Sequence, residues 1–482
     1  MAIILSERGY FWDAKIELSE TLFAPDEAVY GLLEVDEEGS IRLELDGLLK
    51  GPGSIDFNSE KTNEQLDICG KLKSDASSVM LIGAYRNGQT YSTHNISHEK
   101  FVSLHCLASK CEVEMLKKQF KNLRSVKAYC GSYKSLFAVQ NIKYKKTRRK
   151  ITAAYKFDKA RVIKGVTRTV IIDQDIKIPY GNERQLDHIE LDCCPTIEVK
   201  FPSMISVQEA SLEFTRIQDL LTILTGRRCD IGWPRVIDQK NDTFVTLYYL
   251  RGRQLHEGLE RHHCWTHICQ IDSNIQDIIS SWFERREILG AGIFLYLATR
   301  RGMDMYAEHR FMSLMWGLEA FHRALSPQAD DAAVRNKIDR IIEAVAPKDR
   351  RWLRKRLSGP VEPGLDTRIY KLFESLPIGI SSIELSRFAQ ECRTIRNNIS
   401  HFGSIQRSEG ESDYDRLNKL SMAVSYLYHL RVLMEISVPK DHIRWIAIQS
   451  FSAGFIRRSL QAVGINLIDE EKKYRKDRSV TE

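Results

Sequence analysis

The residues best suited to chemistry lie in a short segment late in the chain, residues 388–402. Projected as a helix at about 100° per residue, its apolar residues form one narrow stripe and its polar residues gather away from that stripe. The apolar stripe consists of Phe388, Cys392, Ile395, Ile399 and Phe402. The polar side holds Arg393, Arg396, Asn397, Ser400 and His401. The pattern predicts an amphipathic helix that exposes two guanidinium groups, an amide, a hydroxyl and an imidazole.

Such a polar face could act on a phosphodiester. A guanidinium group stays charged and matches phosphate oxygens with a planar fork of donors, while an imidazole can exchange a proton near neutral pH. RNA supplies its own nucleophile in the 2′-hydroxyl, so an imidazole and a guanidinium could cleave it without a metal. The products would be a 2′,3′-cyclic phosphate and a 5′-hydroxyl. The alternative is plain: a polar face with one histidine is more often just a solvated face.

Two basic clusters could bind an RNA backbone. Residues 143–168 hold eleven Lys or Arg and one acidic residue, Asp158. They could follow phosphates by counterion release, with Tyr144 and Tyr155 available for stacking on bases. The candidate contacts are Lys145, Lys146, Arg148 and Arg149. The alternative is a solvated hairpin whose positive edge discourages aggregation.

The second basic cluster, residues 348–356, lies within the helical part of the chain and therefore nearer the candidate helix in sequence. Its candidate RNA contacts are Arg350, Arg351, Arg354 and Lys355.

A third segment, residues 262–269, is dense in metal-ligand types. His262, His263, Cys264, His267 and Cys269 could supply two or three of the four ligands that a tetrahedral zinc site needs. No second ligand pair stands at a familiar spacing. We therefore expect packing or surface roles for these side chains, and no metal and no cofactor.

The overall composition narrows the possibilities. The chain of 482 residues has 71 basic and 64 acidic residues, a formal net charge of +7, so polyanion binding has to come from local patches. There is no Gly-rich phosphate loop to indicate ATP hydrolysis. Ten scattered cysteines and a first segment without a secretory signal favour a reduced, cytoplasmic protein. The longest apolar run, residues 290–298, is far shorter than the roughly 20 residues of a transmembrane helix, so no membrane contact is expected.

The pattern along the chain predicts an α+β multidomain protein. Residues 1–160 alternate in short runs broken by Gly, Asn and Asp, which is typical of a β-sandwich or barrel-like domain. Residues 161–272 mix strands with one helix, and either extend the same sheet or form a small α+β unit. Residues 273–482 predict an all-α domain. Its helices are expected near 275–299, 304–326, 331–346, 366–374, 383–402, 413–437 and 440–462, and Ser381 with Glu384 predicts a capping box at the start of the fifth.

Several motifs together resemble a known family. The residues Arg396 and Asn397, followed after three residues by His401, resemble the HEPN nuclease motif near the end of an amphipathic helix. Residues 308–323 resemble the preceding helix of HEPN domains in ApeA-type anti-phage proteins, where Phe311, Leu314 and residues 318–323 match recurring positions. The opening resembles the N-terminal domain of that family, in residues 9–12, 30–33, 41–45 and 69–70. The order and spacing of these motifs cover most of the chain.

The resemblance implies a fold and an activity. A HEPN helical bundle would form a homodimer, or a higher homo-oligomer, in which two Arg/His motifs face each other as one RNA-cleaving site. Arg396 and His401 would be catalytic, Asn397 would orient the phosphate or the imidazole, and Arg393 would be a second phosphate contact or a surface residue. Glu319 could hydrogen-bond into this site, although a pairing with Arg323 at i+4 is favoured.

The resemblance also implies a biological setting. Family members act in abortive phage infection by cutting host RNA, with tRNA as the expected substrate and a phage-derived trigger for activation. An alternative stays open, because some HEPN domains have lost the nuclease. Such a domain would serve as a non-catalytic module that binds RNA or a protein partner.

Overall fold

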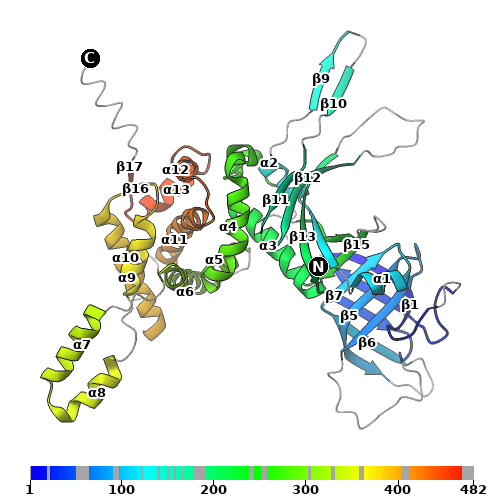
Figure 1. The fold of residues 1–482 in the computed structure, drawn as a ribbon, viewed down its shortest axis with the longest axis horizontal. Helices are drawn as coiled ribbons and strands as arrows, with labels where there is room; N and C mark the ends of the chain where they lie inside the picture. Colours follow the sequence, from blue (N-terminus) through cyan, green and yellow to red (C-terminus); the bar gives the residue numbers. More distant parts are fainter. Residues whose placement is uncertain are drawn as a thin grey trace. The chain divides into compact units, whose positions relative to one another are not determined.

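A computed structural model gives the fold (Figure 1). It describes residues 2–18, 22–49, 65–90, 97–120, 123–137, 142–148, 151–155, 159–165, 167–177, 192–228, 231–237, 244–251, 258–301, 305–326, 332–357, 363–402 and 413–468. The chain forms two compact units: Met1–Thr222 with Arg228–Arg261, and Ile223–Arg227 with His262–Glu482. The first is rich in strands and the second is helical, which confirms the predicted α+β multidomain class.

In the first unit, the described residues form a sheet of thirteen strands in the order β11-β12-β13-β8-β14-β15-β7-β5-β4-β1-β2-β3-β6. Six strands come from the start of the chain: β1 (Ile3–Asp13), β2 (Val29–Asp36), β3 (Ile41–Leu45), β4 (Leu66–Leu72), β5 (Ser78–Thr90) and β6 (His98–Ser103). The other seven are β7 (His105–Ser109), β8 (Leu123–Tyr129), β11 (Arg161–Lys164), β12 (Thr169–Lys177), β13 (Asp192–Ile205), β14 (Arg235–Ile237) and β15 (Phe244–Tyr249).

The long strand β5 closes part of this sheet on itself. Its first half pairs with β4 and β7, and its second half, from Tyr85 onward, pairs with β6. Gly83 lies where the partner changes and has φ +59°, a left-handed conformation that glycine adopts without strain and that bends the strand. The strands β1 to β6 thus enclose a core.

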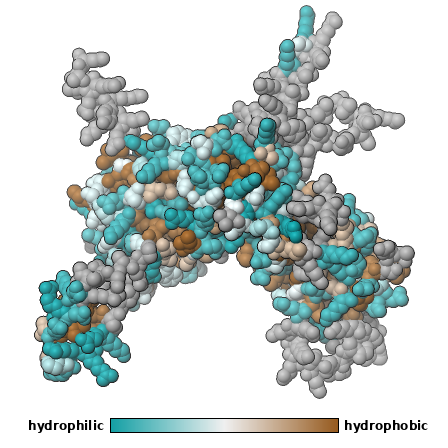
Figure 2. All heavy atoms as spheres, viewed as in Figure 1, coloured by the Kyte–Doolittle hydropathy of each residue, from teal (hydrophilic) through white to brown (hydrophobic). Residues whose placement is uncertain are grey.

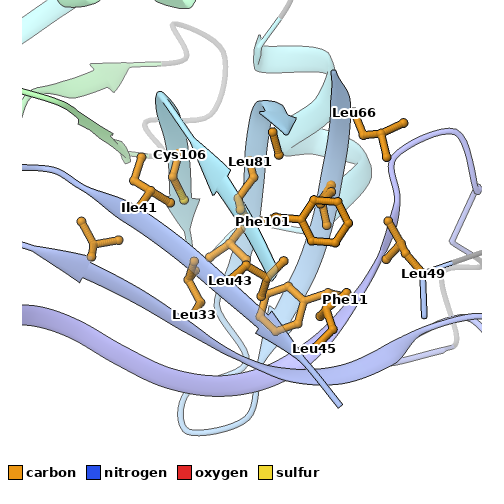
Figure 3. Packing of buried hydrophobic residues seen from close by; sticks show 14 of the residues in the cluster. Phe11, Leu33, Ile41, Leu43, Leu45, Leu49, Leu66, Leu81, Phe101 and Cys106 are labelled. Carbon is orange, nitrogen blue, oxygen red and sulfur yellow. The ribbon is translucent and has the colours of Figure 1, made fainter. Parts of the chain in front are cut away.

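The enclosed core follows from simple alternation. In β3 the residues Ile41, Leu43 and Leu45 are fully buried while the residues between them are exposed. Their side chains meet those of Phe11 and Phe101 inside the closed sheet (Figure 3). This part of the molecule is held by apolar packing.

The strands beyond residue 160 belong to the same sheet. The strand β8 pairs with β13 and β14, and β15 pairs with β7, so the middle of the chain extends the sheet that the first residues begin. The strands of residues 161–249 lie in this sheet, whereas Ile223–Arg227 and the residues from His262 onward belong to the second unit. The domain boundaries at 160 and 272 stay predictions. The α-helices between the strands of this sheet are α1 (Val113–Phe120), α2 (Lys134–Phe137) and α3 (Val207–Thr225).

A separate two-stranded hairpin joins β9 (Ile142–Lys146) to β10 (Ile151–Tyr155). It carries the first part of the first basic cluster, and residues 161–164 of that cluster form β11 of the large sheet. Lys145 lies opposite Thr152 and Lys146 opposite Ile151.

The second unit is a bundle of helices. They are α4 (Ile275–Leu289), α5 (Ala291–Arg300), α6 (Ala307–Leu325), α7 (Ala332–Ala344), α8 (Pro347–Leu357), α9 (Leu365–Glu374), α10 (Ser382–Phe402), α11 (Asp413–Glu435), α12 (Lys440–Ile448) and α13 (Ala453–Gln461). The short strands β16 (Gly379–Ile380) and β17 (Leu467–Ile468) pair beside them.

The helix α11 runs through the core of this bundle. Tyr428 donates a hydrogen bond to the carbonyl of Gly292 at 2.8 Å, and the Nε2 of His429 donates to the carbonyl of Ile223 at 2.8 Å. The Nδ1 of His429 then accepts from the hydroxyl of Tyr296, so the imidazole is neutral. Burial lowers the pKa of His429 to about 3.

Three expectations about helices were wrong. The expected helix at 275–299 is split because Gly290 has φ +44° and its N–H bonds to Arg286 as a cap. The expected helix at 440–462 is split near Ser450, whose hydroxyl donates to the carbonyl of Ile446. The helix α8 was not expected, although Pro347 stands at its first position, where proline is favoured.

The predicted capping box at Ser381 is also wrong. Both carboxylate oxygens of Glu384 accept hydrogen bonds from Asn466, one from its backbone and one from its side chain, at 2.9 Å each. The carboxylate therefore ties the start of α10 to the end of the described chain. Among the described residues, no helix has the length and apolar character needed to span a membrane.

Candidate functional site

The helix α10 has the two faces that the sequence predicted. Phe388, Cys392 and Ile395 are buried against the bundle, at 1%, 0% and 7% exposure. Ile399 is half-buried, and the side chain of Phe402 lies outside the described residues. On the other side Arg393, Ser400 and His401 are exposed, and Arg396 and Asn397 are half-buried. Four predicted site residues therefore lie on one helix face.

Arg396 is held at both ends of its guanidinium fork. Its Nη2 donates to the Glu319 carboxylate at 3.0 Å, and its Nη1 donates to the side-chain oxygen of Asn397 at 3.2 Å. Both side chains of the ion pair are sheltered, with 25% of Arg396 and 16% of Glu319 exposed. Limited access to water strengthens a charged pair and limits its motion.

The partner of Glu319 corrects an expectation. The sequence favoured a pairing with Arg323 on the same helix, whereas the structure joins Glu319 of α6 to Arg396 of α10. The two residues are 77 positions apart, and they meet because α6 and α10 pack in the same bundle.

Arg393 has a similar but more exposed partner. Its Nη1 donates to the carboxylate of Asp366 at 3.2 Å, and half of the Arg393 side chain is exposed. Asp366 lies in the first turn of α9. The candidate helix therefore carries two arginines, one turn apart, that carboxylates from two different helices orient.

His401 lies in the last turn of α10, one turn after Asn397. Its side chain is exposed. Together the face offers a fixed guanidinium, an amide that touches it, and an imidazole open to solvent. This set can bind a phosphate oxygen and exchange a proton beside it, and none of these three groups depends on a metal to do so.

The remaining candidates lie elsewhere in the chain. Lys145, Lys146 and Arg148 are exposed on and just after β9, and Arg149 lies outside the described residues. Arg351, Arg354 and Lys355 are exposed on α8. Arg350 is half-buried, and its guanidinium donates to the carbonyls of Val345 and Glu343 at 2.9 and 2.7 Å. It therefore fastens α8 to the end of α7.

The Cys/His segment is only partly buried: His262 and Cys269 are exposed, and His263 and His267 are half-buried. The thiol of Cys264 is buried and donates to the carbonyl of Thr266, and the rings of His262 and His263 lie against Phe451. Among the described residues, Cys264, His267 and Cys269 do not belong to a metal-sized cluster, whereas the ligand atoms of His262, His263 and Glu260 lie within 4.8 Å of one another.

Sequence reasoning missed one residue and ranked another too low. Asp366 is 27 positions from Arg393, and an acidic residue in the first turn of a helix already has a role with the helix dipole, so nothing pointed to the pair. Glu319 did carry a signal, because a hydrogen bond into the site was one of its two interpretations.

Comparison with known families agrees with this arrangement. The family model described as ApeA N-terminal domain 1 matches residues 6–282, more than half of the chain, and the one described as Apea-like HEPN matches residues 312–442, which contain α10 and its motif. Comparisons with curated proteins and with solved structures gave no match. The resemblance inferred from the motifs is confirmed: the chain belongs to the ApeA family, anti-phage proteins with an N-terminal ApeA domain followed by a HEPN domain.

Proposed function

We propose that this protein is a metal-independent endoribonuclease of phage defence, with Arg396 and His401 at its active site. The observation that carries the proposal is the fixed guanidinium of Arg396. Within a motif that HEPN ribonucleases share, the fork is held by Glu319 and Asn397 on the same face as the exposed His401.

Arg396 also keeps donors for a ligand. Each of its two Nη nitrogens uses one hydrogen for a protein contact and keeps a second hydrogen for a ligand. A phosphate oxygen is the kind of acceptor that such a group binds. Arg393, one turn earlier, would hold a neighbouring phosphate.

The proposed reaction is an internal transfer. The 2′-hydroxyl of the substrate attacks the adjacent phosphorus, and the bond from phosphorus to the 5′-oxygen breaks. An imidazole of His401 removes the 2′ proton or gives a proton to the departing 5′-oxygen, and Arg396 stabilises charge on the phosphoryl oxygens. The products are a 2′,3′-cyclic phosphate and a 5′-hydroxyl.

Membership of the family supports a further proposal about the assembly and the substrate. We propose a homodimer, or a higher homo-oligomer, in which two copies of the motif form one composite site, because a single face offers one imidazole and the reaction moves two protons. The expected substrate is host tRNA, cut after a phage-derived trigger activates the protein in the cytoplasm.

A second function belongs to a different class. In a non-catalytic HEPN module, the same face would bind RNA or a partner protein without cutting it. The pairing of Arg393 with Asp366 suits this alternative, because a half-exposed ion pair can exchange its carboxylate for a phosphate.

Substitution of His401 and Arg396 tests the proposal. We expect His401→Ala and Arg396→Ala each to lower cleavage by about a hundredfold or more, because each removes a group that acts only in the transition state. Both variants should keep the circular dichroism spectrum and oligomeric state of the wild type, since both side chains have access to solvent. Cleavage by purified His401→Ala at the wild-type rate refutes the proposal.

Analysis of the RNA ends separates the alternatives. RNA incubated in EDTA with wild-type protein purified from phage-infected cells, where the proposed trigger has acted, should carry 2′,3′-cyclic phosphate and 5′-hydroxyl ends. Uncut RNA that stays bound indicates the binding module. Cleavage that disappears only on chelation indicates a metal enzyme instead.

A further inference from the structure

The helices α7 and α8 form a strongly basic hairpin (Figure 1). Residues 332–357 hold nine Lys or Arg and three Asp or Glu, a formal +6, compared with +7 for all 482 residues. Hydrophilic residues cover much of its visible surface (Figure 2). A charge this concentrated attracts a polyanion.

The hairpin has a distinct internal side. Ile342 of α7 is buried at 2% exposure, and Leu353 and Leu357 of α8 are half-buried. Arg350 lies on this side and bonds to the last carbonyls of α7. The apolar contact between Ile342, Leu353 and Leu357, together with the hydrogen bonds of Arg350, determines which side of α8 faces solvent.

The outward side of α8 is centred on Trp352, which is 63% exposed. Helical spacing places Lys348 one turn before it, and Lys355 and Arg356 one turn after it. The guanidinium of Arg356 lies 6.0 Å from the centre of the Trp352 ring. A flat indole is therefore surrounded by cations on an accessible helix face.

We infer that Trp352 stacks on an unpaired base of RNA while the surrounding cations hold the phosphates on either side. Aromatic rings bind single strands in this way, because every base has a face to stack on and the charges follow the backbone. A base inside a duplex is already stacked on its neighbours. The preferred ligand is thus RNA with an unpaired segment, such as a loop, and the inference rests on the proposed function only in taking this RNA to be the one that is cut.

A membrane surface fits the hairpin less well. Interfacial helices bury a broad apolar face, whereas the described side chains of the hairpin expose two large apolar residues, Trp352 on α8 and Ile341 on α7.

Binding to matched single-stranded and double-stranded RNA tests the inference. The probe is fluorescently labelled oligoadenylate, alone or paired with oligouridine, and the protein is the full chain carrying His401→Ala so that nothing is cut. We expect Trp352→Ala to weaken single-strand binding by about tenfold and to leave duplex binding unchanged. Trp352→Phe should retain the preference, and Trp352→Leu should lose it, because stacking needs a ring.

A matched aromatic on α13 is the control. Phe455 is 49% exposed and has the guanidinium of Arg458 at 4.9 Å from its ring, yet it lies outside the basic hairpin. Phe455→Ala should bind RNA like the parent. The inference is overturned if Trp352→Ala lowers the affinity for single strands and duplexes equally, or lowers neither. It is also overturned if Trp352→Ala weakens binding to phosphatidylserine vesicles and leaves RNA binding unchanged.

Failure of the inference and failure of the proposed function are distinguishable. A wild type that binds single strands through Trp352 without cutting RNA refutes the nuclease alone. A wild type that cuts RNA, with binding insensitive to Trp352, refutes the stacking role alone. Equal thermal unfolding of Trp352→Ala and the parent shows that the exposed side chain, and not the fold, is responsible.

Discussion

Two helices of the same unit, α10 and α8, use arginine in opposite ways. On α10 each of Arg393 and Arg396 is oriented by a carboxylate from a neighbouring helix, at 3.2 and 3.0 Å. On α8 six basic residues share the helix with one carboxylate, Asp349. The guanidinium of Arg396 has a defined direction, whereas α8 presents a concentration of positive charge.

This difference between α10 and α8 suits two different tasks, catalysis and electrostatic binding of RNA. Stabilising a transition state needs hydrogen-bond donors that are already in position. A carboxylate that orients an arginine therefore favours catalysis, even though it lowers the net positive charge of the site. Attracting a polyanion needs only charge, and there a carboxylate would reduce the effect. Changes at α10 should therefore alter the rate of cleavage, and changes at α8 should alter affinity and its response to salt.

The largest expected effect separates orientation from charge at α10. We expect Glu319→Gln to lower the cleavage rate at saturating RNA by roughly a hundredfold, because the Arg396 fork loses the charged group that directs it. RNA affinity should hold or rise, since a negative charge is removed. Single-turnover cleavage and a separate binding titration measure the two.

Glu391→Gln is the matched control on the same helix. Both oxygens of Glu391 accept from Arg416 of α11 at 2.6 Å, away from Arg396. If this variant loses cleavage as severely as Glu319→Gln, the effect reports damage to α10 in general, and the positioning role of Glu319 is rejected.

The next effect concerns the stability of the helical bundle, through the buried His429 of α11. His429 is buried with its pKa lowered to about 3, whereas an imidazole in an unfolded chain titrates near about 6.5. As the pH falls below that value, His429 becomes protonated in the unfolded state but stays neutral in the folded state. The free energy of unfolding is therefore highest above about pH 6.5 and decreases toward pH 3. Between about pH 6.5 and about pH 5 the loss is about 2 kcal/mol.

Urea unfolding across this pH range checks the assignment. His429→Gln should be less stable at neutral pH but should lose less on acidification than the wild type. An unchanged pH slope in the variant would falsify the role of His429. Because this loss belongs to the bundle, α10 and α8 are best compared above pH 6.5.

The smallest effect is expected on α8. Arg351→Ala and Lys355→Ala should each weaken binding of single-stranded RNA severalfold at low salt and lower the slope of log affinity against log salt by about 0.7. Arg457→Ala on α13 serves as the control for a basic residue outside the hairpin. A salt slope that stays at the wild-type value in both α8 variants contradicts an electrostatic role for this helix.

Much of the candidate site could be predicted from the sequence, because its motif residues all lie on the single helix α10. The spacing of Phe388, Cys392 and Ile395 is enough to orient α10, and with it the exposed face of Arg393 and His401. The partners of that face come from elsewhere in the chain. Nothing near Glu319 or Asp366 in sequence states which arginine each will meet, because that depends on how α6, α9 and α10 pack.

The fold shows the same division. Alternation predicted strands such as β3, but not that β5 would close the sheet by changing partners at Gly83. Pairing between distant strands is decided by the assembled sheet. The break between α4 and α5 at Gly290 could have been predicted, because glycine often ends a helix. The apolar run on either side of it instead favoured one continuous helix.

The composition of the helical unit has a consequence for any attempt to isolate it. Five residues, Ile223–Arg227, belong to this unit although the chain returns to the first unit before continuing at His262. They supply the carbonyls that Arg300 and His429 bind, and Gly226 lies against the ring of Trp265. A fragment starting at His262 would leave the buried N–H of His429 without an acceptor, a cost of about 1–3 kcal/mol. The helical unit is thus not a detachable module, and its stability depends on residues that lie within the sequence of the first unit.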